Sequence, residues 1–472
     1  MIVQICLFSE LKIRRCRRQW LDRNPIGWSF QERLMSSQSR SAELFVRGRK
    51  SIPDGVNSPL RSFTLVGGDP ILAREASGAR IVDVDGKSYL DFLNGFGALI
   101  LGHAHPAVVE AIGRQAAHGT SYGLSTEAEY ELAERIVAST AAIEAIRFVC
   151  SGTEAVMTAT RIARSHTGRD LILKFRGSYH GHSDALLASP MNLREGAGEL
   201  KMVSRGIAHH ANRDVLLAEY NDVEEVARIF AEHGDHIAAV LVEPHSTNMG
   251  FVKSRPEFIR LLRDVTHQYG ALLIFDEVVS GFRFNFGGIS NLFDVDPDLT
   301  TFGKIIGGGT PVGAFAGKSV YLSHVAVGGG VFQSGTFAGN PLTMAAGNAA
   351  LEVIGRPGFY GALEEKGALL ERRLLEGFGA HGVPFVVSRI GSVLGIALRE
   401  DHEPMRNYRD VKTQDYELFR RFHRRMRDEG FLLAPSAEEP MFLSAALAEA
   451  DLERFAATAV AALVGLRGVI EP

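Results

Sequence analysis

The sequence predicts an α/β protein with a mostly parallel main sheet, and two observations support this fold class. Short β-rich runs alternate with longer segments of helical periodicity, which is typical of a parallel sheet covered by helices. The chain has 472 residues, of which 46% are hydrophobic and 22% are charged. It can therefore bury a sizeable core and form more than one domain.

The elements of the large domain can be assigned along the chain. We expect strands at residues 146–150, 171–175, 238–242 and 272–275, and helices at 154–165 and 256–269. Before them, residues 80–90 predict a hairpin with its turn at Asp85-Gly86. After Pro357 the pattern changes to helices and short strands, so we infer a smaller α+β domain built from both ends of the chain. The predicted division is a basic N-terminal arm with a poorly ordered start (1–50), the first part of the small domain (51–105), the large domain (106–350) and the second part of the small domain (351–472).

Composition narrows the kinds of partner. The formal net charge is −4 and the pI is about 6.5, so the chain lacks the excess of Lys and Arg that nucleic acid or an anionic membrane would require. No apolar run approaches the roughly 18 residues of a membrane span. Cys6, Cys16 and Cys150 are too few for a disulfide framework or a zinc site, which fits a reducing compartment. We expect a cytoplasmic protein that acts on small molecules.

The N-terminus differs from the rest of the chain. Lys and Arg crowd residues 12–18, after the short apolar run Ile2 to Phe8, which is the reverse of a secretory signal. An organellar presequence stays open. We favour a solvated basic arm, or an upstream start whose natural counterpart is Met35.

Candidate chemistry lies where apolar strands end in polar residues, which is where an open α/β sheet places its ligand site. Ser151-Gly152-Thr153 joins a strand to a helix, so its backbone N–H groups either hold a phosphate or simply begin a capped helix. Asp276 follows the apolar strand 272–275, where it either meets a cation such as a protonated pyridine nitrogen or forms a turn.

Two further strand ends carry a lysine and an aromatic residue. Lys304 lies between an apolar strand and a glycine run, where desolvation would make its amine nucleophilic, unless it is a lysine that extends to solvent. Tyr179-His180-Gly181-His182 follows strand 171–175 and offers an aromatic face for a ring, or a polar surface turn. His180 and His182 lack a third residue at metal-ligand spacing, so we expect no metal.

Taken together, these motifs resemble a known family. From Gly55 to the C-terminus the chain is similar to the class-III aminotransferases, and most similar to their glutamate-1-semialdehyde 2,1-aminomutase branch. These are dimeric enzymes of fold type I that use pyridoxal 5'-phosphate (PLP). The motifs are Gly55-Val56-Asn57-Ser58-Pro59-Leu60-Arg61, Leu101-Gly102-His103-Ala104-His105-Pro106, Ser151-Gly152-Thr153-Glu154-Ala155, Tyr179-His180-Gly181-His182, Val242-Glu243-Pro244, Asp276-Glu277-Val278, Gly303-Lys304-Ile305-Ile306-Gly307-Gly308-Gly309 and Ser334-Gly335-Thr336-Phe337-Ala338-Gly339-Asn340-Pro341.

The resemblance implies a role for each matching residue. Lys304 is the Schiff-base lysine, Asp276 pairs with the pyridine nitrogen and Tyr179 stacks near the ring; these three are the predicted catalytic residues. Further cofactor-binding residues are Ser151, Gly152, Thr153, His180, Glu243 and Thr336, the last donated by the neighbouring subunit of a homodimer. The implied substrate-binding residues are Ser58, Arg61, Phe96 and Glu439, with the arginine on a carboxylate.

The chain also departs from the branch. A different composition at 186–195 replaces the Gly- and Ser-rich gating loop, and Phe96 stands where tryptophan is usual. His245-Ser246-Thr247 replaces small residues, and Leu447 replaces a common histidine. We therefore prefer an aminotransferase that moves an amino group between an amino donor and a carbonyl acceptor. The alternative is a true aminomutase that gives 5-aminolevulinate; a PLP decarboxylase or a noncatalytic PLP-binding protein is less favoured.

Overall fold

The computed structural model describes residues 39–187, 204, 206–208, 211 and 213–467. The basic segment 12–18, Met35 and most of the predicted gating-loop departure at 188–195 lie outside these residues. The chain divides into two compact units, Met1–Asn57 and Ser58–Pro472. In the first unit, Ser39 caps the start of α3 (Arg40–Gly48), because its side chain accepts a hydrogen bond from the Ala42 N–H.

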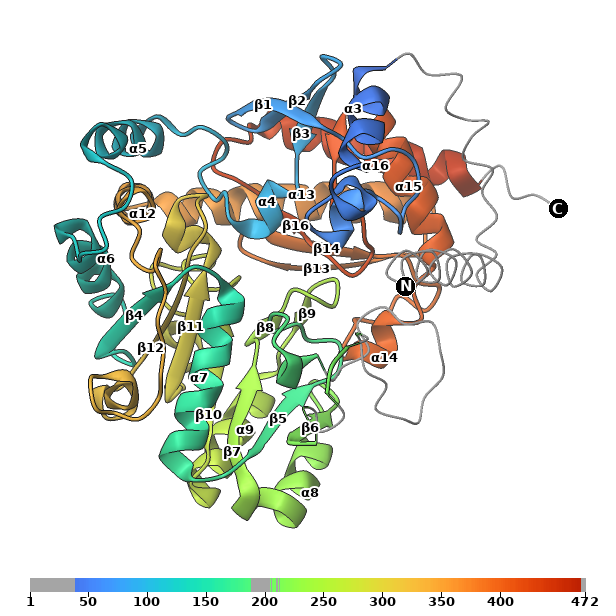
Figure 1. Cartoon of the computed structure of the whole chain (residues 1–472). Coiled ribbons are helices and arrows are strands. Elements are labelled where there is room, and N and C mark those ends of the chain that lie inside the picture. The colour runs from blue at the N-terminus through green and yellow to red at the C-terminus, as the bar shows by residue number, and fades with distance from the viewer. Residues whose placement is uncertain (1–38, 188–203, 205, 209–210, 212, 468–472) are drawn as a thin grey trace, which may run out of the picture. The chain divides into compact units, whose positions relative to one another are not determined.

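The second unit contains a seven-stranded sheet (Figure 1). Its strands, in spatial order, are β4 (Ala145–Val149), β12 (Gly313–Gly317), β11 (Leu299–Gly303), β10 (Leu272–Glu277), β7 (Ile237–Val242), β5 (Leu171–Phe175) and β6 (Val215–Ala218). From β11 to β6 every neighbouring pair is parallel, whereas β12 runs antiparallel to both β11 and β4. Six of the seven strands therefore point the same way, which confirms the mostly parallel sheet.

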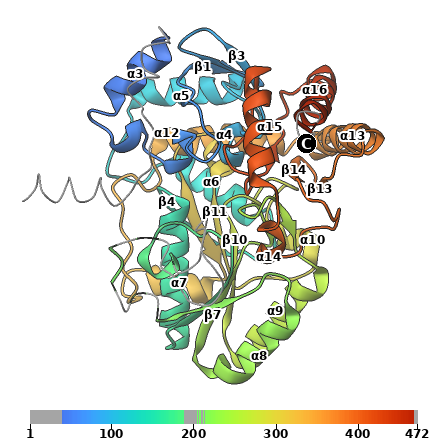
Figure 2. The same cartoon turned by 90° about the vertical axis from the view of Figure 1, so that its right-hand side faces the viewer.

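Helices cover both faces of this sheet (Figure 2). On one face, Ala155, Ala159 and Ala163 of α7 (Gly152–Thr167) pack on Leu241 and Ile274. On the other, α8 (Val223–His233) and α9 (Pro256–Tyr269) pack their apolar sides on the remaining strand residues, in a second core cluster. The strands read as continuous apolar runs because both faces are buried.

The predicted elements of this domain agree with the structure to within two or three residues. Helix α9 has the predicted bounds of 256–269. Helix α7 begins at Gly152 rather than Glu154 because the Ser151 hydroxyl accepts a hydrogen bond from the Glu154 N–H and caps it. Strand β4 ends one residue early, at Val149.

A smaller α+β domain combines both chain ends. Its four-stranded sheet orders β1 (Ala73–Ser77), β2 (Arg80–Asp83), β3 (Ser88–Asp91) and β15 (Phe431–Leu432). Strands β2 and β3 form the predicted hairpin, with Gly86 at φ 89° in the turn. Strand β15 pairs with β3 across more than 300 residues of chain. The two ends also share one hydrophobic core, in which Leu90 and Phe92 pack with Phe431 and Phe455. The predicted boundaries after residues 50, 105 and 350 stay predictions.

The remaining strands and helices complete the two domains. The strands are β13 (Val386–Ile390), β14 (Val393–Ala397) and β16 (Met441–Phe442) in one sheet, and β8 (His245–Ser246) and β9 (Val252–Lys253) in another. The helices are α4 (Asn94–Gly97), α5 (Pro106–His118), α6 (Glu127–Val137), α10 (Ser290–Phe293), α11 (Ser319–Leu322), α12 (Pro341–Ile354), α13 (Phe359–Ala380), α14 (Tyr408–Val411), α15 (Tyr416–Asp428) and α16 (Glu449–Arg467). Within the described part of the chain, no helix is both long and apolar enough to span a membrane.

Candidate active site

The predicted site residues gather at one edge of the large sheet. The Ser151 turn follows β4, the Tyr179-His180 turn follows β5, Glu243 follows β7, Asp276 ends β10 and Lys304 follows β11. These five strands point the same way, so their carboxyl ends meet at the same edge. The sequence patterns thus become one site through the topology of the sheet.

Asp276 is buried and held by three hydrogen bonds. Its Oδ2 accepts from His180 Nδ1 at 2.7 Å, and its Oδ1 accepts from the Thr301 hydroxyl at 3.1 Å and the Val278 N–H at 3.2 Å. Because an ionised carboxylate only accepts, His180 carries its proton on Nδ1. Burial lowers the pKa of His180, although Asp276 opposes the shift. The neutral ring leaves its buried Nε2 as an acceptor without a partner among the described residues.

Lys304 has an unusual backbone and a perturbed amine. Its φ of 48° lies in the left-handed region, which costs a non-glycine residue about 1–3 kcal/mol and is typical of functional sites. Burial lowers the pKa of its amine, the carboxylates of Glu439, Glu243 and Asp276 oppose this shift, and Arg283 adds to it. A lysine that simply extends into solvent would not lose hydration, so the nucleophilic interpretation is favoured.

Two glutamates complete the charged surroundings of Lys304. Burial raises the pKa of Glu243 to about 7, although hydrogen bonds from the Thr247 hydroxyl and from Asn248 Nδ2, the latter at 3.1 Å, hold its carboxylate. Burial also raises the pKa of Glu439 to about 7, while Lys304 opposes that shift. Proton donors and acceptors that titrate near neutral pH therefore surround one amine.

The start of α7 forms the other half of the site. The first-turn N–H groups of a helix have no partner inside the helix and carry its positive dipole end, so they suit an anion such as a phosphate. Thr153 Oγ1 lies 3.2 Å from His182 Nδ1. A Cβ at Gly181, where φ is 83°, would lie 2.6 Å from the same hydroxyl oxygen, so only glycine fits this turn. Tyr179 is 38% exposed, and partial burial raises its pKa while a hydrogen bond with Thr153 lowers it.

These residues fit a ring that carries a basic nitrogen and a phosphate. Asp276 is a buried carboxylate whose three hydrogen bonds within the described part of the chain come from neutral groups, while Lys304 and Lys174 act on it only through space, so it can accept a hydrogen bond from a cation. The helix start supplies an anion cradle and Lys304 an amine. No group of three or more His, Cys, Asp or Glu side chains within the described residues could hold a metal ion.

Four predicted residues are less closely joined to this centre. Ser58 precedes a 3₁₀ turn (Pro59–Ser62) that carries the exposed Arg61. Phe96 lies in α4, with φ of 56°, and Thr336 is exposed. Among the described residues, no hydrogen bond or ion pair links these four to Lys304 or Asp276. The segment around Thr336 does approach the start of α7, since Ser334, Gly335 and Ala338 line a cavity of about 180 Å³ that also borders Cys150.

Three positions at which the chain departs from the aminomutase branch have different surroundings in the structure. The ring of buried His245 accepts a hydrogen bond from the Ser254 N–H at 3.2 Å and packs near three phenylalanines, so its role is structural. Thr247 contacts the site through Glu243. We expected the change at Leu447 to alter the pocket. Leu447 instead lies in the core of the small domain, so the change there affects packing.

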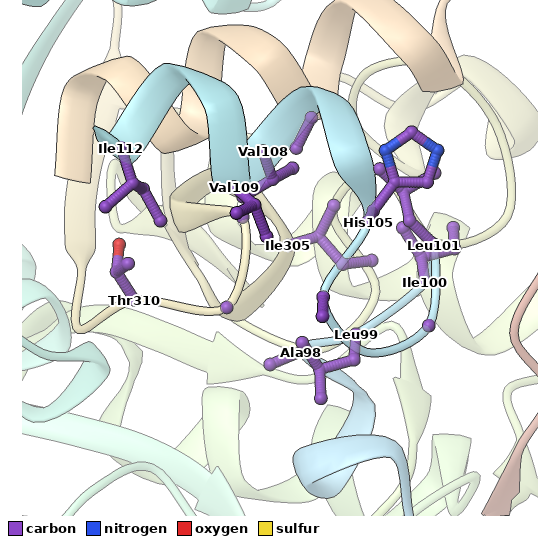
Figure 3. A pocket seen from close by; sticks show the side chains of 15 residues that line it. Ala98, Leu99, Ile100, Leu101, His105, Val108, Val109, Ile112, Ile305 and Thr310 are labelled. Carbon is purple, nitrogen blue, oxygen red and sulfur yellow. The ribbon is translucent and has the colours of Figure 1, made fainter. Parts of the chain in front are cut away.

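An apolar cavity of about 170 Å³ lies beside this centre without containing its ionisable groups. Figure 3 shows Val109 and Ile112 of α5 on one side of it and Leu99 and Ile305 on the other. Because Ile305 directly follows Lys304, this cavity is adjacent to the site. Its apolar lining, however, offers little to a charged ligand.

The sequence analysis missed several residues that support the site. Thr301 lies in the apolar strand before Lys304, but its pairing opposite Asp276 depends on the β10–β11 register. Lys174 is buried in β5, where burial lowers its pKa to about 8 and Asp276 opposes the shift. Fully buried Arg283 donates to the carbonyl oxygens of Gly97 and Leu443. For Lys174 and Arg283, the available signal was a charged side chain in or beside an apolar run.

Fold and site together define a PLP-dependent enzyme of fold type I. Residues 65–457 match the family described as aminotransferase class-III. A glutamate-1-semialdehyde 2,1-aminomutase of Thermomicrobium roseum is 46% identical over 417 residues, which cover 88% of this chain and 95% of that one. The chain therefore belongs to the class-III aminotransferase family, and its cofactor is PLP.

Solved structures agree with this assignment. An omega-transaminase from Sphaerobacter thermophilus superposes with a TM-score of 0.85 at 35% identity, over 92% of this chain and 99% of that chain. A glutamate-1-semialdehyde aminomutase from Pseudomonas aeruginosa gives a TM-score of 0.78 at 27% identity, over 90% and 94% respectively. A second structure of that aminomutase is in complex with PMP, the amino form of the cofactor. It has a TM-score of 0.79 at 26% identity, with the same coverage. The predicted fold, family and cofactor are confirmed.

Proposed function

We propose that this enzyme transfers an amino group within glutamate-1-semialdehyde, in the manner of a 2,1-aminomutase that gives 5-aminolevulinate. The observation that carries the proposal is 43–46% identity, over about nine-tenths of both chains, to relatives that bear that name. These relatives favour the alternative over the two-substrate aminotransferase that the sequence analysis preferred. The cluster of Lys304, Asp276, Glu243 and Glu439 supports amino transfer in either case.

In this proposal, each residue has a stated task. Lys304 would hold PLP through its amine and move protons, and Asp276, fixed by His180 and Thr301, would accept a hydrogen bond from the protonated ring nitrogen. PLP, when bound, supplies an electron-withdrawing ring that stabilises negative charge on the substrate carbon beside the nitrogen. Ser151, Gly152 and Thr153 would bind the phosphate and Tyr179 would contact the ring, while Thr336 would serve the neighbouring site of a homodimer. Ser58, Arg61, Phe96 and Glu439 bind the substrate, the arginine through its carboxylate.

Two of these tasks have direct physical support. The lowered pKa of Lys304 keeps a larger fraction of the amine uncharged, and only the uncharged amine attacks a carbonyl. Glu439, with a pKa of about 7, can exchange a proton or bind an amino group near neutral pH. A cytoplasmic location remains our expectation from the cysteine content.

A two-substrate aminotransferase is the second candidate, and one observation favours it. The superposition on the omega-transaminase has the higher TM-score and the higher identity of the two enzyme types compared. Two features are consistent with a changed pocket: Phe96 stands in place of tryptophan, and the Thr247 hydroxyl donates a hydrogen bond to Glu243.

One assay separates the candidates. Purified enzyme is incubated with glutamate-1-semialdehyde alone, and 5-aminolevulinate is measured. It is then incubated with amino donors and keto acids. We expect turnover of the semialdehyde without a keto acid; turnover only with a donor and an acceptor would support the aminotransferase instead. Lys304→Ala is the control and should abolish turnover and the visible absorption of lysine-bound PLP.

A further inference from the structure

Glu439 lies in a loop, Leu433–Pro440, whose shape depends on the residue before it. Glu438 has a side chain that is only 4% exposed. Its N–H donates to the Ser436 hydroxyl at 3.1 Å, and its carbonyl oxygen accepts from the Gly250 N–H at 2.8 Å. The backbone of this loop is therefore fixed on both sides of the Glu438 side chain.

A lysine from outside the loop neutralises Glu438. Lys412, which follows α14, places Nζ 2.7 Å from Glu438 Oε1, and the Tyr416 hydroxyl donates to the same oxygen at 2.7 Å. The ammonium lies 4.6 Å from the ring centroid of Tyr408 and 5.6 Å from that of Tyr416. A carboxylate and two aromatic faces thus hold one cation in place.

This ion pair bears directly on Glu439. Removing one charge from a buried ion pair is strongly unfavourable, so the Lys412–Glu438 contact is held firmly. Among the described residues, the charged groups that act on Glu439 are Lys304, Glu243 and Glu438, and the two carboxylates raise its pKa. Burial lowers the pKa of Lys412, but Glu438 raises it above its ordinary value, so Lys412 stays charged. Its charge offsets that of Glu438 close to the substrate site.

We propose that Lys412 is a positioning residue for Glu439: by pairing with Glu438 it fixes the loop Leu433–Pro440 and cancels the second negative charge beside the Glu439 carboxyl. The inference rests on the proposed role of Glu439 in the substrate site. Lys412 itself contacts neither PLP nor substrate in this assignment.

The test uses four variants, of which the two single charge-removing ones have opposite predicted signs. Lys412→Met removes one positive charge beside Glu438, so Lys304 and Glu439 should both hold their protons more tightly. Glu438→Gln removes the negative charge and should have the opposite effect. The double variant removes both charges and should return toward the wild type. Lys412→Arg keeps the positive charge, so its pH midpoint of PLP binding should match that of the wild type.

The readout is the pH midpoint of PLP binding to the cofactor-free protein, followed by visible absorbance, with the pH profile of kcat as a second measurement. Because Lys304 and Glu439 interact strongly, the midpoint belongs to the pair, with Glu243, Asp276 and Arg283 as the other charges that act on Lys304. We expect an upward shift of about one pH unit for Lys412→Met and a downward shift of similar size for Glu438→Gln.

A structural control separates charge from damage. Arg389 pairs with Glu364 and Glu371, both at 2.8 Å, in the same domain. Arg389→Met should lower the thermal midpoint without moving the pH midpoint. The proposal is overturned if the two single variants shift the midpoint in the same direction or not at all, or if the double variant is further from the wild type than either.

Two other outcomes are also decisive. If Lys412→Met does not fold, Glu438→Gln still decides by its sign, because glutamine keeps the shape of the side chain. If the wild-type protein binds no PLP, the proposed function itself is wrong, and the inference falls with it.

Discussion

Replacing Asp276 with asparagine should remove the charge that the site presents to the cofactor while leaving the fold intact. The asparagine side chain would keep one oxygen to accept from Thr301 and the Val278 N–H, at the positions now 3.1 and 3.2 Å away. Its amide could donate to His180 Nδ1, because the ring can move its proton to the buried Nε2. The loss is then confined to the charge-assisted bond to the ring nitrogen.

The size of that loss follows from the bond type. A hydrogen bond to a charged group contributes about 1.5–3 kcal/mol net, and the burial of Asp276 favours the upper end. A transition state destabilised by about 3 kcal/mol lowers the rate about 150-fold. We would measure kcat/KM in the amino-transfer assay and the thermal midpoint of the cofactor-free protein.

Thr301→Val is the matched control for Asp276→Asn. It removes a neutral hydrogen bond to the same carboxylate, worth about 1 kcal/mol, so activity should fall no more than about tenfold. If Asp276→Asn retains more than about a third of wild-type activity with PLP bound, the pairing of Asp276 with the ring nitrogen is refuted.

Two further predictions concern Gly181, in the turn that contacts Thr153, and the buried carboxyl of Glu277. Gly181→Ala should weaken PLP binding at least about tenfold because its Cβ meets Thr153; Gly86→Ala, also at positive φ but with open space around it, should cost about 1 kcal/mol of stability and leave PLP affinity unchanged. Equal affinities for the two variants would contradict this. Burial raises the pKa of Glu277 to about 8 in the folded chain, from 4.5 in the unfolded chain. Between these two pH values the unfolded chain has lost this proton and the folded chain still holds it. The free energy of unfolding of the wild type should therefore fall as pH rises from about 4.5 to 8. Glu277→Gln should therefore gain stability relative to the wild type over that range, as thermal midpoints would reveal; an unchanged difference across pH would contradict it.

The sequence alone placed four strands and two helices of the large domain, because apolar runs and helical periodicity are properties of neighbouring residues. It also indicated Lys304, Asp276 and the Ser151 turn as candidate site residues, since each polar residue directly follows an apolar strand. The family resemblance added their roles and named PLP. The apolar pattern predicts the start of α7 at Glu154, whereas the Ser151 cap lets the helix begin at Gly152.

Tertiary structure decided which side chains meet. His180 and Asp276 are 96 residues apart, and Thr301 faces Asp276 only through the register of β10 and β11. Lys412 and Glu438, 26 residues apart, meet through the packing of two separate segments. The pKa of Lys304 depends on burial and on charges from other segments of the chain, which no local pattern records. Sequence periodicity determines where elements form, whereas through-space contact and desolvation determine what their ends can do.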